Sequence, residues 1–168
     1  CDIHDWIYCL GGAIWTPHNL AEVHSRGLET ENSIAWQQSK TRLRLALKTA
    51  YVLSTTLASY LPGDGSIGKQ IPYTPRYNGR IGLSLQTGPF LINYDHSYTG
   101  YRFVTVDESQ FLEPYQTGNI QALYTFRRTA YELQCALQVL NIWDTPYEIV
   151  NGRPMPGRQF LLRLQLVL

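Results

Sequence analysis

The chain has 168 residues, enough for one domain, and its 44% hydrophobic and 16% charged residues are ordinary for a folded protein and exclude a disordered one. A formal net charge of +1, with no basic run interleaved with aromatic residues, argues against nucleic acid as a partner. The aromatic fraction of 12% is dominated by twelve Tyr and four Trp, side chains that favour membrane interfaces.

A helical membrane protein is excluded, because no stretch approaches the roughly 18 apolar residues of a membrane-spanning helix. The first residues also lack the charged region and apolar core of a signal peptide. An outer-membrane β-barrel is not excluded, since its strands alternate and keep the average hydropathy modest.

Alternation of apolar and polar residues with a period of two predicts β-strands along the whole chain. In chain order the predicted strands span residues 3–10, 28–36, 42–54, 80–86, 90–99, 119–126, 131–139 and 159–168. The last strand shows the pattern best, because Phe160, Leu162 and Leu164 alternate with Arg163 and Gln165. The strand at 3–10 is the least regular.

The two faces of these strands differ in charge. The apolar faces of the predicted strands contain no Asp, Glu, Lys or Arg. The opposite faces carry Glu29, Glu31, Arg42, Arg44, Lys48, Arg80, Asp95, Glu132 and Arg163. One face therefore meets an apolar medium, which is either lipid outside a membrane barrel or the core of a soluble, lipocalin-like barrel.

The connections favour the membrane barrel, because short turns alternate with long links. The short turns lie at 37–41, 86–89 and 127–130, and the long links at 11–22, 59–75, 104–114 and 144–158. Short periplasmic turns, long external loops and strands of about ten residues are typical of transmembrane barrels. This orientation places Tyr98, Tyr101, Phe103, Tyr115 and Trp143 towards the outer interface, and Trp36 and Phe126 towards the inner one.

The terminal block NIWDTPYEIVNGRPMPGRQFLLRLQL, which begins at Asn141, resembles the closing strand, loop and strand of TonB-dependent outer-membrane receptors. Four further matches occur in the same order along the chain. They are DWIYC with WTPHNLAEVHSRGLE from Asp5, GKQIPYTPRYNGRIGL from Gly68, YTGYRFVTVDES from Tyr98 and FLEPYQTGNIQALYTF from Phe111. The resemblance therefore covers nearly the whole chain, although Leu168 departs from the terminal aromatic residue of many barrel proteins.

The resemblance implies an all-β fold of about eight antiparallel transmembrane strands, the C-terminal part of a barrel of about 22 strands. Residues 1–168 would form this barrel portion alone, without a plug domain. It further implies a Gram-negative outer membrane as the location and membrane lipid as a partner. The other implied partners are the remaining barrel and plug, from the same gene or from a second chain, and TonB acting through the plug. The expected ligand is a small molecule, namely a siderophore or other iron chelate, haem or cobalamin, and no cofactor and no enzymatic activity are expected.

No catalytic or metal site is predicted. Asp95, His96 and Ser97 are consecutive, but strand alternation sends His96 to the face opposite its neighbours, so the three cannot form a triad. His4, His18, His24 and His96 have no metal-ligand spacing. Cys1, Cys9 and Cys135 give neither a metal motif nor a secure disulfide.

Two groups of residues are candidates for ligand contact. Those predicted on the external loops are Trp15, His18, Tyr60, Tyr101, Arg102 and Asp107. The nine charged residues named above are predicted to face the lumen, where they either bind an anionic ligand or pair across strands. Interface anchoring and loop packing are the alternative roles for the loop residues.

Three functions remain open from the sequence: a receptor barrel portion, a soluble lipocalin-like carrier, and a small closed structural barrel of the outer membrane. A carrier would turn its charged face outward to water. A small closed barrel would pair its last strand with its first.

Overall fold

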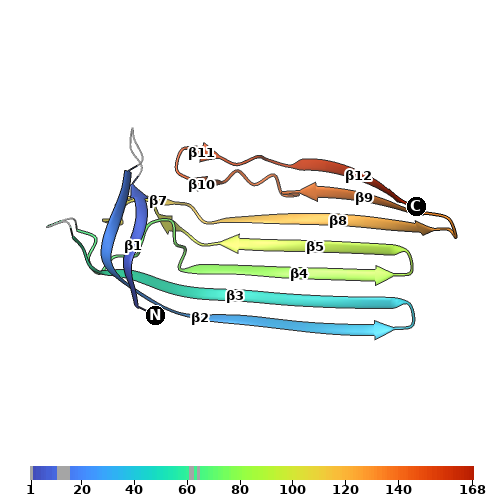
Figure 1. Cartoon of the computed structure of the whole chain (residues 1–168), viewed down its shortest axis with the longest axis horizontal. Coiled ribbons are helices and arrows are strands. Elements are labelled where there is room, and N and C mark those ends of the chain that lie inside the picture. Colours follow the sequence, from blue (N-terminus) through green and yellow to red (C-terminus); the bar gives the residue numbers. More distant parts are fainter. Residues whose placement is uncertain (1, 11–15, 61–62, 64) are drawn as a thin grey trace.

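The computed structural model describes residues 2–10, 16–60, 63 and 65–168, with side chains described from residue 22 onwards. The described chain is all-β, and no helix within it is long and apolar enough to cross a membrane. Eight strands form one antiparallel sheet in the order β1-β2-β3-β4-β5-β8-β9-β12 (Figure 1). They are β1 (Asp2–Leu10), β2 (Thr16–Gln38), β3 (Thr41–Ala58), β4 (Tyr77–Thr87), β5 (Phe90–Thr99), β8 (Tyr115–Arg127), β9 (Glu132–Leu140) and β12 (Gln159–Val167).

The eight predicted strands and the three short turns are confirmed, with boundaries shifted by a few residues in most strands. Two of the long links contain small hairpins that alternation did not predict. They are β6 (Arg102–Phe103) with β7 (Phe111–Leu112), and β10 (Glu148–Val150) with β11 (Arg153–Pro154). The sheet is open, because β1 and β12 lie at opposite edges, so the pairing expected of a small closed barrel does not form.

The predicted long link at 11–22 is wrong for most of its length, since β2 already begins at Thr16. Residues 16–24 of β2 do not alternate, but they pair with all of β1, from Thr16 opposite Leu10 to His24 opposite Asp2. This pairing supplies backbone hydrogen bonds without requiring an apolar face. Figure 1 shows the β1–β2 pair bending away from the plane of the other strands.

Buried apolar side chains are few and lie outside the regular part of the sheet. Among the described residues, the buried hydrophobic ones are Val23, Ile71 and Leu112. Ile71 belongs to the link after β3, whose backbone bonds to the end of that strand: Ile71 N donates to Ser54 O at 2.8 Å, and Thr56 N to Lys69 O at 3.0 Å. The link thus extends the sheet on the loop side, and Val23 and Ile71 form the small core there.

The large apolar side chains of the sheet are instead exposed on one face. Leu28 is 68% exposed, Ile34 71% and Phe160 70%. Register places the apolar residues of neighbouring strands side by side, as in the row Ile34, Leu45, Leu83 and Tyr94. An apolar face of this extent is not stable against water and indicates contact with an apolar medium.

Two aromatic rows border this apolar face. Trp36, Phe90, Tyr124 and Phe126 lie near the short turns, and Tyr51, Tyr77, Tyr98 and Trp143 lie near the loops. The ring centroids of Tyr51 and Tyr77 are 4.8 Å apart, and those of Phe90 and Tyr124 are 4.7 Å apart. Aromatic rows at both ends of an apolar band are typical of membrane barrels.

Relative to the strand register, the aromatic row near the turns shifts further towards the turns from β2 to β8. Register leads from Trp36 through Leu43, Leu85 and Ile92 to Ala122 in β8, whereas the aromatic residues of β8 are Tyr124 and Phe126. A step of two to four residues across four strand spacings, about 7–13 Å over about 19 Å, corresponds to a strand tilt of roughly 20–35°. The row near the loops steps in the same direction, because Tyr77 lies level with Gly100 and Tyr98 is two residues closer to the turns.

Trp143 joins the row near the loops by packing over Gly118 of β8. Ile142 N donates to Gly118 O at 2.8 Å, and a Cβ at Gly118 would lie 2.6 Å from Trp143 Nε1. We expect Gly118→Ala to push Trp143 away and to cost about 1–3 kcal/mol of stability. The measurement is the temperature at which the unheated, folded band of the full-length protein disappears on a gel.

Gly79→Ala is the matched control, because its Cβ would approach no atom closer than Lys48 O at 3.7 Å. Equal transition temperatures for the two variants would show that Trp143 is not held over Gly118.

Candidate functional site

The polar face of the sheet collects the charged residues predicted to face the lumen. Strand register places all nine on one face, as in the row Glu31, Lys48, Arg80 and Ser97. A hollow of about 510 Å³ opens on this face. Its polar lining includes Glu29, Glu31, Lys48, Asn78, Arg80 and Ser97.

Several of these charges pair across strands. Lys48 Nζ lies 2.8 Å from Glu31 Oε1, and Arg80 Nη2 lies 2.9 Å from Asp95 Oδ1. Glu132 pairs with Arg127, which is outside the nine predicted residues, at 2.6 Å. Exposed pairs of this kind contribute only about 0–1 kcal/mol each, so their main effect is to fix side-chain positions.

Other charges of this face have no ion-pair partner in the described part of the chain. Arg42, Arg44 and Arg163 form no ion pair there, and Arg42 and Arg163 lie in the same register row. Glu29 also forms no ion pair in that part of the chain, so the polar face carries excess negative charge near the loops and positive charge nearer the turns. The side chains of this face can donate hydrogen bonds to a polar ligand or a second protein surface, and can accept hydrogen bonds from either.

A second group of contacting residues lies among the loops, where Arg102 fixes the loop that carries β10 and β11. Arg102 is only 4% exposed, donates from Nη2 to Glu148 O at 3.0 Å, and lies 5.0 Å from the Tyr115 ring centroid. Tyr115 stacks on Tyr147 with ring centroids 4.4 Å apart. Burial raises the pKa of the Tyr147 phenol, and the neighbouring Tyr115 adds to the rise.

A cleft of about 390 Å³ lies beside this stack. Its lining is aromatic and proline-rich and includes Phe111, Pro114, Tyr115, Pro146, Tyr147 and Met155. Rigid aromatic and proline side chains lose little conformational entropy on binding. The cleft is thus suited to a flat or apolar part of a ligand.

Glu108 ties two of the loops together. Its carboxylate accepts a hydrogen bond from Gln70 N at 2.8 Å and lies 3.6 Å from Arg76 Nη2 and 3.8 Å from Lys69 Nζ. The Gln70 side chain is buried and accepts a hydrogen bond from Ser54 N at 3.1 Å. Glu108 therefore connects the link after β3 to the β6–β7 loop.

The residues predicted to contact ligand are not brought together. Tyr60 and Asp107 are exposed, Tyr101 is partly buried with its hydroxyl 3.4 Å from Arg76 Nη1, and Arg102 is engaged inside the protein. None of these four lines the cleft. Trp15 and the side chain of His18 lie outside the described residues, so these two contacts stay predictions.

Asp107 organises its own loop rather than a shared site. Hydrogen bonds from the Ser109 hydroxyl first, then from Thr105 and the Ser109 backbone, lower the pKa of Asp107 to about 2. The carboxylate therefore stays ionised at neutral pH.

Asp95 and His96 lie on opposite faces of β5, as the alternation predicts. Asp95 pairs with Arg80 on the polar face, whereas His96 Nδ1 lies 3.2 Å from the Tyr94 hydroxyl on the other face. No group of three metal-binding side chains occurs in the part of the chain that the structure describes. Cys135 is a free thiol, and the side chains of Cys1 and Cys9 lie outside the described residues.

Comparison with known proteins gives a consistent result. The family described as "TonB dependent receptor-like, beta-barrel" matches residues 2–142. Among solved structures, the chain is similar to the ferric citrate transporter FecA in the unliganded form, with a TM-score of 0.72 and 17% identity over 85% of this chain and 24% of that chain. No curated protein sequence matches.

Two further structures are similar. They are BauA, the ferric preacinetobactin receptor from Acinetobacter baumannii (TM-score 0.63, 10% identity, 88% of this chain and 29% of that chain), and FyuA, the ferric yersiniabactin uptake receptor from Yersinia pestis (0.62, 16%, 90% and 23%). The chain spans about a quarter of the length of these structures. At these identities the likeness shows the fold alone, and it confirms the predicted fold class.

The contacts of Glu108 predict a loop that opens more easily when they are removed. We expect Glu108→Ala to remove a charged hydrogen bond worth about 1.5–3 kcal/mol. Trypsin should then cut after Lys69 about tenfold faster or more, because cleavage follows the population of the open loop. The measurement is limited proteolysis of the full-length protein in detergent.

Asp107→Ala is the control, since the contacts of Asp107 lie within its own loop. The same acceleration in both variants would contradict a specific role for Glu108.

Proposed function

This chain belongs to the TonB dependent receptor-like β-barrel family, and we propose that it forms the C-terminal part of an outer-membrane receptor that imports an iron chelate. The family consists of receptors and transporters rather than enzymes. In the proposal, the imported ligand crosses the membrane without chemical change. The remaining barrel, a plug domain, and TonB acting through that plug are the proposed partners.

The observation that carries the proposal is the exposed apolar face between two aromatic rows. Its side chains need an apolar medium, and the stepped rows fit tilted strands in a membrane. A soluble carrier would instead enclose its apolar face, which this open sheet does not do. Membrane lipid is therefore the proposed partner of the apolar face.

The open edges of the sheet support a larger barrel. Each unpaired backbone N–H or C=O group in hydrocarbon costs several kcal/mol, so strands at the edge of an open sheet need neighbours. We propose that further strands of the receptor cover both edges, and that the polar face then lines the lumen. The arginines Arg42, Arg44 and Arg163 would face the plug or the ligand path.

We propose an iron chelate as the ligand, which is a narrower class than the ligands expected from the family resemblance. The names of the three similar structures all refer to ferric chelates, which favours an iron chelate over haem or cobalamin. The loop cleft beside Tyr115 and Tyr147 would contact the ligand as it enters from outside. Haem and cobalamin are the competing ligands in the test below.

Growth under iron limitation tests the proposal. A Gram-negative host that makes the full-length protein should carry it in the outer membrane as a heat-modifiable band, and should accumulate radiolabelled iron from one ferric chelate. Accumulation should fall to the background of cells lacking the gene when TonB is deleted.

Parallel assays with haem and labelled cobalamin identify the ligand class. If only haem or cobalamin is taken up, the ligand is haem or cobalamin rather than an iron chelate, and the rest of the proposal stands. A detergent-independent soluble protein, or uptake that does not depend on TonB, would refute the proposal itself.

A further inference from the structure

A hollow of about 440 Å³ lies at the turn end of the sheet, beyond the turn that joins β4 to β5. It exists because β8 continues past this turn. Phe90, the first residue of β5, pairs with Tyr124, and Thr125 N donates to Pro89 O at 3.0 Å. Phe126 and Arg127 then extend further and form one side of the hollow.

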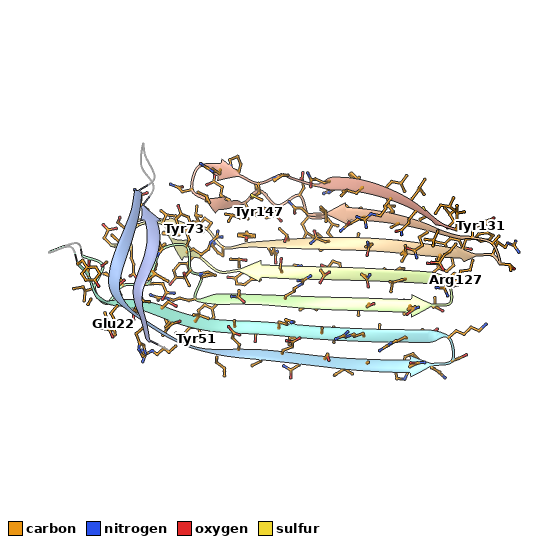
Figure 2. All side chains as sticks on the ribbon, viewed as in Figure 1. Glu22, Tyr51, Tyr73, Arg127, Tyr131 and Tyr147 are labelled. Carbon is orange, nitrogen blue, oxygen red and sulfur yellow. The ribbon has the colours of Figure 1, made fainter. Side chains whose placement is uncertain are left out.

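The apolar side of this hollow is aromatic. Phe90, Tyr124 and Phe126 line it, and the ring of Tyr131 lies 6.2 Å from that of Phe126. Register places Phe126 opposite Leu133, so its ring belongs to the apolar face. Figure 2 shows Arg127 and Tyr131 at this end of the sheet.

Arg128 brings a positive charge to the border of the apolar face. Its guanidinium carbon lies 5.0 Å from the centroid of the Phe126 ring, within cation–π range. The ring therefore places the guanidinium beside the apolar face, while the Arg128 residue stays exposed to solvent. The backbone N of Arg128 donates to Tyr131 O at 2.8 Å, which fixes the turn from which the side chain extends.

The charge of Arg128 is not neutralised by the described residues. The nearby carboxylate of Glu132 pairs with Arg127 at 2.6 Å, and Arg128 has no ion pair in the described part of the chain. An aromatic surface topped by an uncompensated cation matches a molecule with an apolar body and an anionic head. Charge complementarity therefore selects an anionic lipid over a zwitterionic one.

We propose that Arg128 and the aromatic side of this hollow bind the phosphate headgroup of an anionic phospholipid in the leaflet on the turn side of the membrane. The guanidinium donates two hydrogen bonds to the phosphate oxygens, while the acyl chains lie along Phe90, Tyr124 and the apolar face. This site rests on the proposed function, which places the apolar face in lipid and the loops outside, so that the turns lie on the periplasmic side.

Lipid binding to the full-length protein in a mild detergent tests the site. The protein is titrated with short-chain phosphatidylglycerol, with phosphatidylcholine of equal chain length and with inorganic phosphate, and bound molecules are counted by native mass spectrometry. We expect Arg128→Gln to weaken phosphatidylglycerol binding about tenfold, the effect of losing a charged hydrogen bond. Phosphatidylcholine, whose ammonium offsets the charge of its phosphate, should bind the parent protein more weakly and should lose less in this variant.

Lys40→Gln is the matched control. It removes the same charge from another short turn, but Lys40 lies over no aromatic ring among the described residues. Phosphatidylglycerol binding should change less than twofold in this variant. Arg128→Lys keeps the charge without the planar fork and should retain part of the binding.

An equal loss in Lys40→Gln and Arg128→Gln would overturn the site, because it would show general attraction between charges. Competition by inorganic phosphate at the same concentration as the lipid would also overturn it, by showing a site for a free anion. If the protein lies in the outer membrane and imports its ligand but Arg128→Gln binds lipid normally, the lipid site fails while the proposed function stands.

Discussion

Strand register is the constraint on which the rest of the structure depends. Because side chains alternate, a shift of one residue in any strand would move its charged side chains to the apolar face. The register rows keep Glu31 beside Lys48 and place Arg80 within reach of Asp95 on one face, while Ile34, Leu45 and Leu83 stay on the other. These pairs add little energy, so the register is held mainly by the apolar face, into which a shift of one residue would bring charged side chains.

The two ends of the sheet differ in how their connections are held. On the loop side, the link after β3 extends the sheet by backbone pairing, and Glu108 joins that link to the next loop. Arg102 holds a third loop through Glu148 O and the Tyr115 ring. On the turn side the connections are short, and basic and aromatic side chains such as Arg128 and Phe126 lie at the border of the apolar face.

Alternation made the strands and the charged face predictable, because both depend only on neighbouring residues. It could not find the start of β2, where residues 16–24 are held by pairing with β1 rather than by an apolar face. The contacts that shape the candidate site join distant residues, such as Gln70 to Glu108 and Tyr115 to Tyr147, and no spacing in the sequence encodes them. The loop residues predicted to bind ligand were chosen by type, and burial of Arg102 depends on a loop 46 residues away.

The central claim is that the apolar face meets lipid and the polar face meets water. Spin labels placed singly along β5, from Phe90 to Tyr98 in a cysteine-free full-length protein in vesicles, test it most directly. Collision with oxygen should exceed collision with a water-soluble nickel chelate at Ile92 and Tyr94, and the reverse should hold at Asn93 and Asp95. A period of two in these accessibilities is the predicted result, whereas equal access to the nickel chelate at all positions would contradict the claim.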